Sequence, residues 1–320
     1  MAKRQLEDQL EELVRRTAEP ESADAREALA EALAARSSFV VGQAARVIRD
    51  GVIHGFDAAL EAAFDRLADD GVKRDPGSHG KLAIIEALDA TDHPGTGIFE
   101  RASRVVQLEP AWGPPEDTAS PVRARAVLAL ARAPYHDFPL IAGERLADPS
   151  ASVRRAALVG LGIRDDRAGA GLARLKVALG DDDPLVTAEA MSTLLALAPD
   201  VGIEALRALA EGDDPPQAEL ALIALGESRR PAALIVLFDR LEAAVTTAER
   251  ATVMTALALH RSEPAQRVLL EHVGGREADA AAALEALAIH RHDPGLTERA
   301  RAAADEAGRL EVFQAAFRAS

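Results

Sequence analysis

One pattern recurs along the chain at an interval slightly above thirty residues. Its clearest copy spans residues 148–162 and holds an Asp-Pro pair suited to a helix start, then Val153, Ala157 and Leu161 at every fourth position. Gly162 follows and is suited to end the helix. The leucine returns at Leu130, Leu161, Leu194, Leu225, Leu257 and Leu287, in steps of 31, 33, 31, 32 and 30 residues by subtraction. A repeat of this length with two helical segments buries its apolar faces by stacking on its neighbours, so it predicts a helical solenoid.

A small or β-branched residue lies four positions before each of these leucines, which lets neighbouring helices approach closely. Ile48 and Leu88 match the leucine position further upstream, at steps of 40 and 42 residues, so the N-terminal half carries insertions. The pattern predicts an all-α, right-handed α-α superhelix of about eight helix pairs and no sheet. We expect capping helices at 1–36, irregular repeats at 37–120, regular repeats at 121–292 and capping helices at 293–320.

The 148–162 segment resembles the inner half of HEAT repeats of the bilin-lyase-like branch. Together with Asp75-Pro76 and residues 81–88 and 107–118, it makes most of the chain similar to a group of bacterial HEAT-repeat proteins. The resemblance to that group implies the fold and no activity. The resemblance of residues 148–162 to bilin-lyase-like repeats implies one functional hypothesis: that the protein is an accessory protein or lyase for a tetrapyrrole or bilin chromophore.

Composition narrows the functional classes. The formal net charge is −15, which disfavours nucleic-acid binding through a basic face. The absence of cysteine excludes disulfides, thiolate nucleophiles and cysteine-type metal sites. No apolar run reaches the length of a membrane span, and the first residues are charged, so we expect a cytoplasmic protein without membrane contact.

The least regular segment lies at 107–119 and is rich in Pro and Gly, which excludes a helix interior. It contains Trp112, the only tryptophan of the chain, and tryptophan is enriched at interface hot spots. The plainer interpretation is that Trp112 packs on the neighbouring repeat. Because long loops in repeat arrays usually serve a function, we predict a partner-binding region here. Its predicted residues are Gln107, Glu109, Trp112, Asp117, Arg123 and Arg125.

A ladder of arginines follows the aligned leucines. Arginine near a helix C-terminus interacts favourably with the helix dipole, by roughly 0.3–1 kcal/mol, and this is the simplest interpretation. The alternative is a basic ridge that binds an acidic peptide or a phosphate. The residues concerned are Arg132, Arg164, Arg229, Arg261 and Arg291.

Catalytic and metal-binding patterns are sparse. His260 and His290 occupy equivalent positions in successive repeats, and His292 follows, but no carboxylate at a fixed spacing completes a metal site, so we predict none. Asp75, His79 and Lys81 lie close enough in sequence for acid–base chemistry, although a helix-capping turn explains them more simply. No phosphate-binding loop or nucleophile elbow is present, so we predict no catalytic residue and no cofactor.

Three functional hypotheses follow. The first is a non-enzymatic scaffold that binds a protein or peptide through its concave face and the 107–119 loop, since solenoids characteristically offer extended concave surfaces. The second is the tetrapyrrole accessory protein or lyase that the resemblance implies. The third is a HEAT-like DNA glycosylase, which needs a basic cleft with aromatic residues; the acidic composition and single tryptophan disfavour it.

Overall fold

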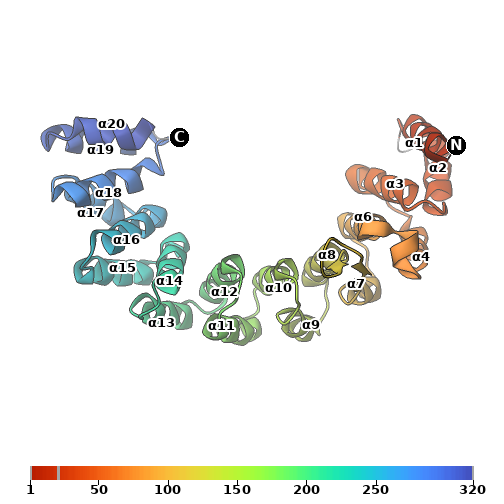
Figure 1. Cartoon of the computed structure of the whole chain (residues 1–320), viewed down its shortest axis with the longest axis horizontal. Helices are drawn as coiled ribbons and strands as arrows, with labels where there is room; N and C mark the ends of the chain where they lie inside the picture. Colours follow the sequence, from red (N-terminus) through yellow and green to blue (C-terminus); the bar gives the residue numbers. More distant parts are fainter. Residues whose placement is uncertain (1, 20–21, 319–320) are drawn as a thin grey trace. The chain divides into compact units, whose positions relative to one another are not determined.

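Antiparallel helix pairs follow one another along the chain in the computed structural model, which describes residues 2–19 and 22–318 (Figure 1). The chain divides into two compact units, Met1–Arg164 and Asp165–Ser320. Helices dominate both units, and the prediction of an all-α solenoid of stacked helix pairs is confirmed.

Unit 1 begins with the pair α1 and α2 and continues with three further pairs and α10. Between α4 and α6 the chain forms a short helix and a 3-10 turn, and between α7 and α8 it forms two short strands. The elements are α1 Ala2–Arg16, α2 Ala23–Leu33, α3 Ser38–Gly51, α4 Asp57–Ala68, α5 Gly71–Arg74, η1 Pro76–Ser78, α6 His79–Ala90, α7 Thr96–Ala102, β1 Leu108–Glu109, β2 Glu116–Asp117, α8 Ser120–Arg132, α9 Phe138–Arg145 and α10 Ala151–Arg164.

Unit 2 is more regular and ends with a single helix after its last pair. Its elements are η2 Arg167–Gly169, α11 Ala170–Leu179, α12 Pro184–Leu197, α13 Pro199–Ala210, α14 Pro215–Ser228, α15 Pro231–Ala243, α16 Thr247–His260, α17 Glu263–Val273, α18 Glu277–Ala288, α19 Pro294–Glu306 and α20 Leu310–Arg318.

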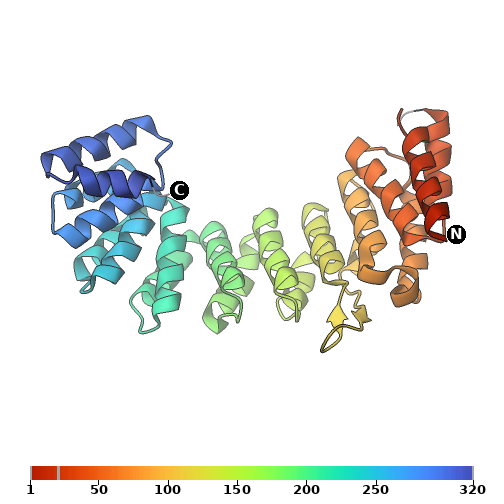
Figure 2. The same cartoon turned by 45° about the horizontal axis from the view of Figure 1, so that its top comes forward.

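The core of each unit follows the repeated pattern of the sequence. Leu130 and Leu161 are buried in α8 and α10, and Leu194, Leu225, Leu257 and Leu287 are buried in α12, α14, α16 and α18. These inner helices pack against one another: α3 on α6 and α8 on α10 in unit 1, and α12 on α14, α14 on α16 and α16 on α18 in unit 2. Within each unit the remaining helices pack on the outer side of the inner ones, as α4 does on α6, α9 on α10 and α17 on α18 (Figures 1 and 2).

Acidic residues before a proline begin several inner helices, as the sequence predicts. The Asp183 carboxylate accepts the Leu185 N–H at 2.8 Å, and the Asp214 carboxylate accepts the Gln217 N–H at 3.3 Å. Each bond satisfies a backbone donor that the first turn of a helix leaves open. The predicted stop at Gly162 is wrong, because α10 continues to Arg164 and the left-handed residue is Asp165, with φ of 46°.

The expectation of an array without a sheet is also wrong at one place. Strands β1 and β2 form an antiparallel hairpin in which Leu108 lies opposite Asp117 and Glu109 lies opposite Glu116. Each strand has two residues, and no other strand occurs among the described residues. In the same part of the chain, no helix is both long enough and apolar enough to cross a membrane.

Candidate functional site: a hairpin held by two buried charge clusters

The β1–β2 hairpin is where unit 1 departs most from a regular array. It connects the end of α7 to the start of α8 and projects beyond the ends of the neighbouring helices (Figure 2). Its tip, residues 110–115, reads Pro-Ala-Trp-Gly-Pro-Pro and is exposed throughout. Prolines restrict the backbone, so this composition limits the conformations that the tip can adopt.

The first support of the hairpin is a cluster of polar residues, here named the lysine cluster: Asp75, Lys81, Gln107, Glu109 and Thr118. Lys81 and Asp75 are both 0% exposed, and the Lys81 Nζ donates to Asp75 Oδ2 at 3.0 Å. The same Nζ donates to Gln107 Oε1 at 2.8 Å, which ties the hairpin to α6. A Cβ added at Gly71 would lie 2.1 Å from Gln107 Oε1, so any larger residue there would displace this amide from the lysine cluster.

Glu109 completes the lysine cluster from strand β1. Its Oε1 accepts hydrogen bonds from Gln107 Nε2 at 2.6 Å, from the Gly77 N–H at 2.7 Å and from Thr118 Oγ1 at 2.8 Å. The hydrogen bond from Gln107, with those from Gly77 and Thr118, lowers the pKa of Glu109 against the opposing effect of burial. The carboxylate therefore joins strand β1 and the residue that follows β2 to the turn before α6.

The second support, here named the arginine cluster, is Arg123 with Asp117 and Asp148. Arg123 is 1% exposed, and its Nε and Nη2 donate to the two oxygens of Asp148 at 2.9 and 2.8 Å. Its Nη1 donates to Asp117 Oδ2 at 2.6 Å and to the Val105 carbonyl at 2.8 Å. One guanidinium thus joins the strand entry, the strand exit and the turn before α10, using the fork geometry that distinguishes arginine from lysine.

Hydrogen bonds keep the arginine cluster charged despite its burial. Burial alone would raise the pKa of Asp148, but the hydrogen bonds from Arg123 and from the Ser150 N–H lower that pKa below its usual value. The pKa of Arg123 is raised, since its bonds to Asp148 and Asp117 outweigh the desolvation that would lower it. Buried ion pairs gain little net stability, so we expect these clusters to specify the position of the hairpin rather than to stabilise the fold.

Trp112 lies at the hairpin tip and contacts little of the chain. Its side chain is exposed to 109% of the reference area, so the interpretation that it packs on a neighbouring repeat is wrong. A tryptophan in this position leaves a large apolar surface in water, and tryptophan is enriched at interface hot spots.

The other predicted partner-binding residues lie beneath the tip. Gln107 and Arg123 are buried, and Glu109 and Asp117 are bonded within the two clusters. Arg125, on α8, pairs with Asp89 of α6 at 2.8 Å. The structure therefore brings Gln107, Glu109, Asp117 and Arg123 together with the tip, and leaves Arg125 in a separate contact.

The arginines of the predicted ladder have different structural roles in the two units. In unit 1, Arg132 pairs with Asp89 at 2.8 Å and Arg164 donates to the Ala133 carbonyl at 2.8 Å. In unit 2, Arg229 and Arg261 close α14 and α16 through left-handed backbone, with φ of 51° and 58°. Arg291 is exposed after the end of α18. Binding of an anion by these residues remains a prediction.

Two of the three histidines considered for a metal site hydrogen-bond to backbone carbonyl groups. His260 Nε2 lies 3.1 Å from the Arg230 carbonyl, His290 Nε2 lies 2.8 Å from the Ala258 carbonyl, and His292 is exposed. No group of three or more metal-binding side chains occurs among the residues that the structure describes. Of the candidate acid–base residues, Asp75 caps α6 by accepting the Gly80 and Lys81 N–H groups at 2.9 Å each, and His79 is exposed.

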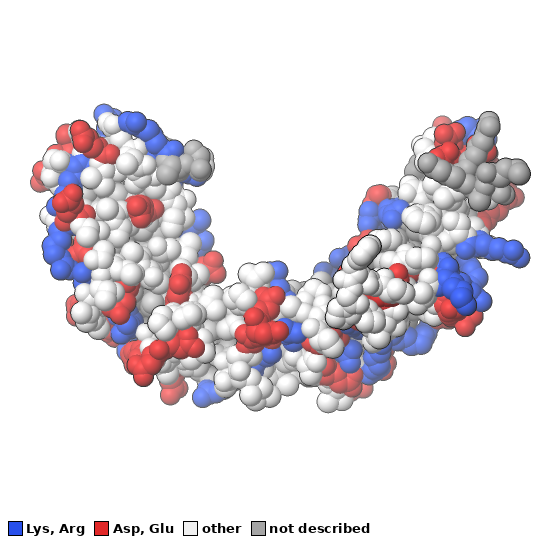
Figure 3. All heavy atoms as spheres, in the orientation of Figure 1, with Lys and Arg blue, Asp and Glu red and all other residues white. Residues whose placement is uncertain are grey.

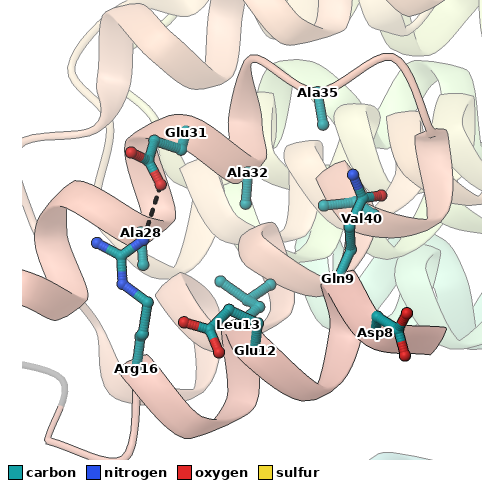
Figure 4. Close-up of a pocket in the computed structure, with 10 residues that line it drawn as sticks. All are labelled: Asp8, Gln9, Glu12, Leu13, Arg16, Ala28, Glu31, Ala32, Ala35 and Val40. Atoms are coloured by element: carbon teal, nitrogen blue, oxygen red, sulfur yellow. Dashed lines mark hydrogen bonds and ion pairs between the residues drawn. The ribbon is translucent and has the colours of Figure 1, made fainter. Parts of the chain in front are cut away.

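A cavity of about 410 Å³ lies between α1, α2 and α3 and is a second candidate (Figure 4). Apolar side chains, including those of Leu13 and Val40, form part of its wall, and Arg16 lies at its rim. The Arg16 guanidinium donates to Glu31 at 2.8 Å and to Asp24 at 2.9 Å. This arginine is therefore engaged within the chain, and the hairpin remains the stronger candidate.

The buried arginines of the inner helices and the strand before the hairpin tip were not predicted from the sequence. The arginines lie seven residues before an aligned leucine, at Arg123, Arg154 and Arg250. Arg123 bonds to Asp148, just before the next inner helix, and Arg250 bonds to Asp279, within it. The alternation of apolar and polar residues from Val106 to Glu109 is the period of a strand. Both signals are present in the sequence.

No protein-family model matches the sequence, and no curated protein matches it. Among solved structures, an engineered protein is similar over 98% of this chain and 95% of its own, at 18% identity and a TM-score of 0.41. The complex of CpcE and CpcF of phycocyanin lyase from Nostoc is similar over 91% of this chain and 94% of the matched chain, at 15% identity and a TM-score of 0.36. Neither likeness indicates a function at these values.

Proposed function

We propose that this protein is a non-enzymatic interaction scaffold that presents the 107–119 hairpin to a protein partner. The observation that carries the proposal is a fully exposed tryptophan on a hairpin fixed by two buried charge clusters. Trp112 is the residue that contacts the partner. Gln107, Glu109, Asp117 and Arg123 position it from beneath.

The two clusters favour binding because they hold the hairpin rigid before a partner arrives. A flexible loop loses conformational entropy when a partner immobilises it, whereas a preorganised loop has already lost that freedom during folding. The hairpin is bonded to α6, α8 and the turn before α10, and its tip holds three prolines. A scaffold with this arrangement holds the base of the hairpin that carries the tryptophan in one place.

Uncharged surface surrounds the charged groups on the faces visible in each unit (Figure 3). Acidic and basic side chains form small clusters of both signs there, separated by large uncharged areas. This distribution supports a protein partner. The concave face lined by the inner helices, the second part of the scaffold hypothesis, is also proposed to contact the partner.

Site-specific photocrosslinking in cells tests the proposal. A photoreactive amino acid replaces Trp112 in one variant and Leu140 in the control; Leu140 lies on α9 of the same unit and is 68% exposed. We expect a specific set of proteins to crosslink at position 112, and none of them to crosslink at position 140. The same set at both positions, or none at either, refutes the proposal.

Substitution of Trp112 supplies an independent readout. Trp112→Ala removes a side chain with no packing role, so we expect a stability change within about 0.5 kcal/mol. Capture of the crosslinked partner by purified protein falls at least tenfold, and Trp112→Phe restores part of it. Unchanged capture by Trp112→Ala excludes the residue from the interface.

The tetrapyrrole hypothesis is tested separately. An absorbance scan of purified protein with added bilin reports binding as a shifted and intensified visible band. An unchanged spectrum removes this hypothesis and leaves the scaffold proposal unaffected.

A further inference from the structure

The extended segment 106–109, which ends in strand β1, turns its polar side chains inward and its apolar side chains outward. Gln107 and Glu109 point into the lysine cluster, whereas Val106 and Leu108 alternate with them and are 62% and 58% exposed. Successive side chains of a strand lie on opposite faces, so this is the inverse of a strand that packs on an apolar core. Two exposed apolar side chains therefore lie on the same face of this extended segment.

The same strand has a backbone edge that faces away from β2. The Thr118 N–H donates to the Gln107 carbonyl at 3.0 Å, which makes this pair of residues a hydrogen-bonded one. In an antiparallel ladder the next pair, Leu108 with Asp117, is then not hydrogen-bonded, and the Leu108 N–H and C=O point outward. Val106 lies two residues before Leu108 and so at an equivalent position of the extended segment. Within the described part of the chain, the backbone N–H and C=O of Val106 have no hydrogen-bond partner.

We infer that this edge receives an extended segment of the partner protein as an added third strand. The inference rests on the proposed function and names the kind of partner. Leu108 offers an outward pair of backbone groups and Val106 an unpaired one, and their side chains favour apolar residues at alternate positions of the incoming strand. Pro110, which lacks an N–H, ends the edge, and Trp112 lies beyond it.

The chemistry of the edge favours a strand over a helix. Unpaired N–H and C=O groups are satisfied by another extended backbone, which a helix lacks because its own groups are paired internally. Natural proteins commonly protect such edges with charged side chains. Here both side chains along the edge are apolar, and the buried clusters hold the strand in place, so little ordering is required on binding.

The test begins with a library of random heptapeptides displayed on phage and selected on the full-length protein. We expect enriched peptides with apolar residues at alternate positions. The decisive variant is Leu108→Pro, which removes the outward N–H while leaving the bonds between β1 and β2 intact, since Leu108 does not take part in them. Its affinity for the best synthetic peptide falls at least tenfold, and far-UV circular dichroism and the unfolding midpoint stay at their wild-type values.

Matched controls separate the backbone from the side chain. Leu108→Ala keeps the N–H and weakens binding less than Leu108→Pro. Peptides N-methylated at every second amide give the complementary control: methylation in the register that faces the edge reduces affinity at least tenfold, and methylation in the alternate register does not. Amide hydrogen exchange at Val106 and Leu108 slows when the unmodified peptide is added.

The inference is overturned by no enriched peptide, by enriched peptides with a helical spacing of apolar residues, by equal binding of Leu108→Pro, or by equal effects of both methylation registers. A wild-type dimer in sedimentation analysis that Leu108→Pro abolishes also overturns it, because a second copy then occupies the edge. Each failure leaves crosslinking at position 112 to decide the proposed function by itself.

Discussion

Replacing Lys81 by methionine probes how the hairpin is held. The side chain keeps its length and loses its charge, so the Asp75 carboxylate stays buried without its ion-pair partner and Gln107 Oε1 loses its donor. Removing one member of a buried ion pair typically costs 3–5 kcal/mol. Asp75 keeps its bonds to the Gly80 and Lys81 N–H groups, so we expect the lower part of this range, about 3 kcal/mol.

Two measurements report the effect of Lys81→Met on stability and on the hairpin. Urea denaturation followed by far-UV circular dichroism gives the change in the free energy of unfolding, and the steady-state fluorescence anisotropy of Trp112 gives the mobility of the tip. Trp112 is the only tryptophan, so its signal comes from this hairpin alone. We expect Lys81→Met to lower the midpoint of unfolding and to reduce the anisotropy before unfolding begins.

Arg207→Met is the matched control for Lys81→Met. Arg207 pairs with Asp239 at 3.0 Å, but the two side chains are 39% and 54% exposed. An exposed ion pair contributes about 0–1 kcal/mol, so this variant changes stability little and leaves the anisotropy unchanged. If Lys81→Met proves as mild as Arg207→Met, the lysine cluster does not hold the hairpin and the reasoning fails.

The remaining predictions concern the array and its response to acid. Leu194→Ala empties a fully buried position on α12 and costs about 2–5 kcal/mol in urea denaturation. Gly226→Ala would place a Cβ 2.3 Å from the Ala256 carbonyl oxygen and destabilises the packing of α14 on α16, whereas Gly162→Ala has open space and gains up to about 1 kcal/mol. The pKa values of Glu109 and Asp148 are lowered in the folded protein, so their contribution to stability is present above their usual values of 4.5 and 3.8 and is lost as the pH falls through the lowered values. The Trp112 anisotropy should therefore decrease only below about pH 4; a decrease between pH 5 and 7 would contradict this assignment.

The repeat fold was predictable because its signal is periodic and local. Leucines such as Leu161 and Leu257 return at nearly constant steps, and each lies in the core between inner helices. Helix ends were less predictable. Gly162 looked like a stop, yet α10 extends past it and ends before Asp165, whose backbone adopts the left-handed conformation instead. Packing against neighbouring helices decides such boundaries, and a sequence pattern does not contain it.

The hairpin was located by its irregular composition, but its internal arrangement was not predictable. Nothing local to Lys81 indicates that it is buried, since lysine is almost never fully buried unless it is paired. Its partners Asp75 and Gln107 lie 6 and 26 residues away in sequence. The exposure of Trp112 was likewise unpredictable, because a tryptophan more often packs inside and only the folded hairpin shows that its tip touches no neighbouring repeat.

The two clusters also connect the hairpin to the stability of unit 1. Lys81 lies in α6, Arg123 lies in α8 and Asp148 precedes α10, so a partner that fixes the hairpin also stabilises the packing of these three inner helices. A ligand that binds only the folded state stabilises it by about 2.7 kcal/mol at a concentration one hundred times its Kd. Neither cluster includes a residue of unit 2. Saturating peptide from the selection should therefore slow amide exchange in α6 and α8, and leave exchange in α16 and α18 unchanged. Equal protection of both sets of helices, or protection of the hairpin alone, would show that the clusters do not transmit binding energy into the array.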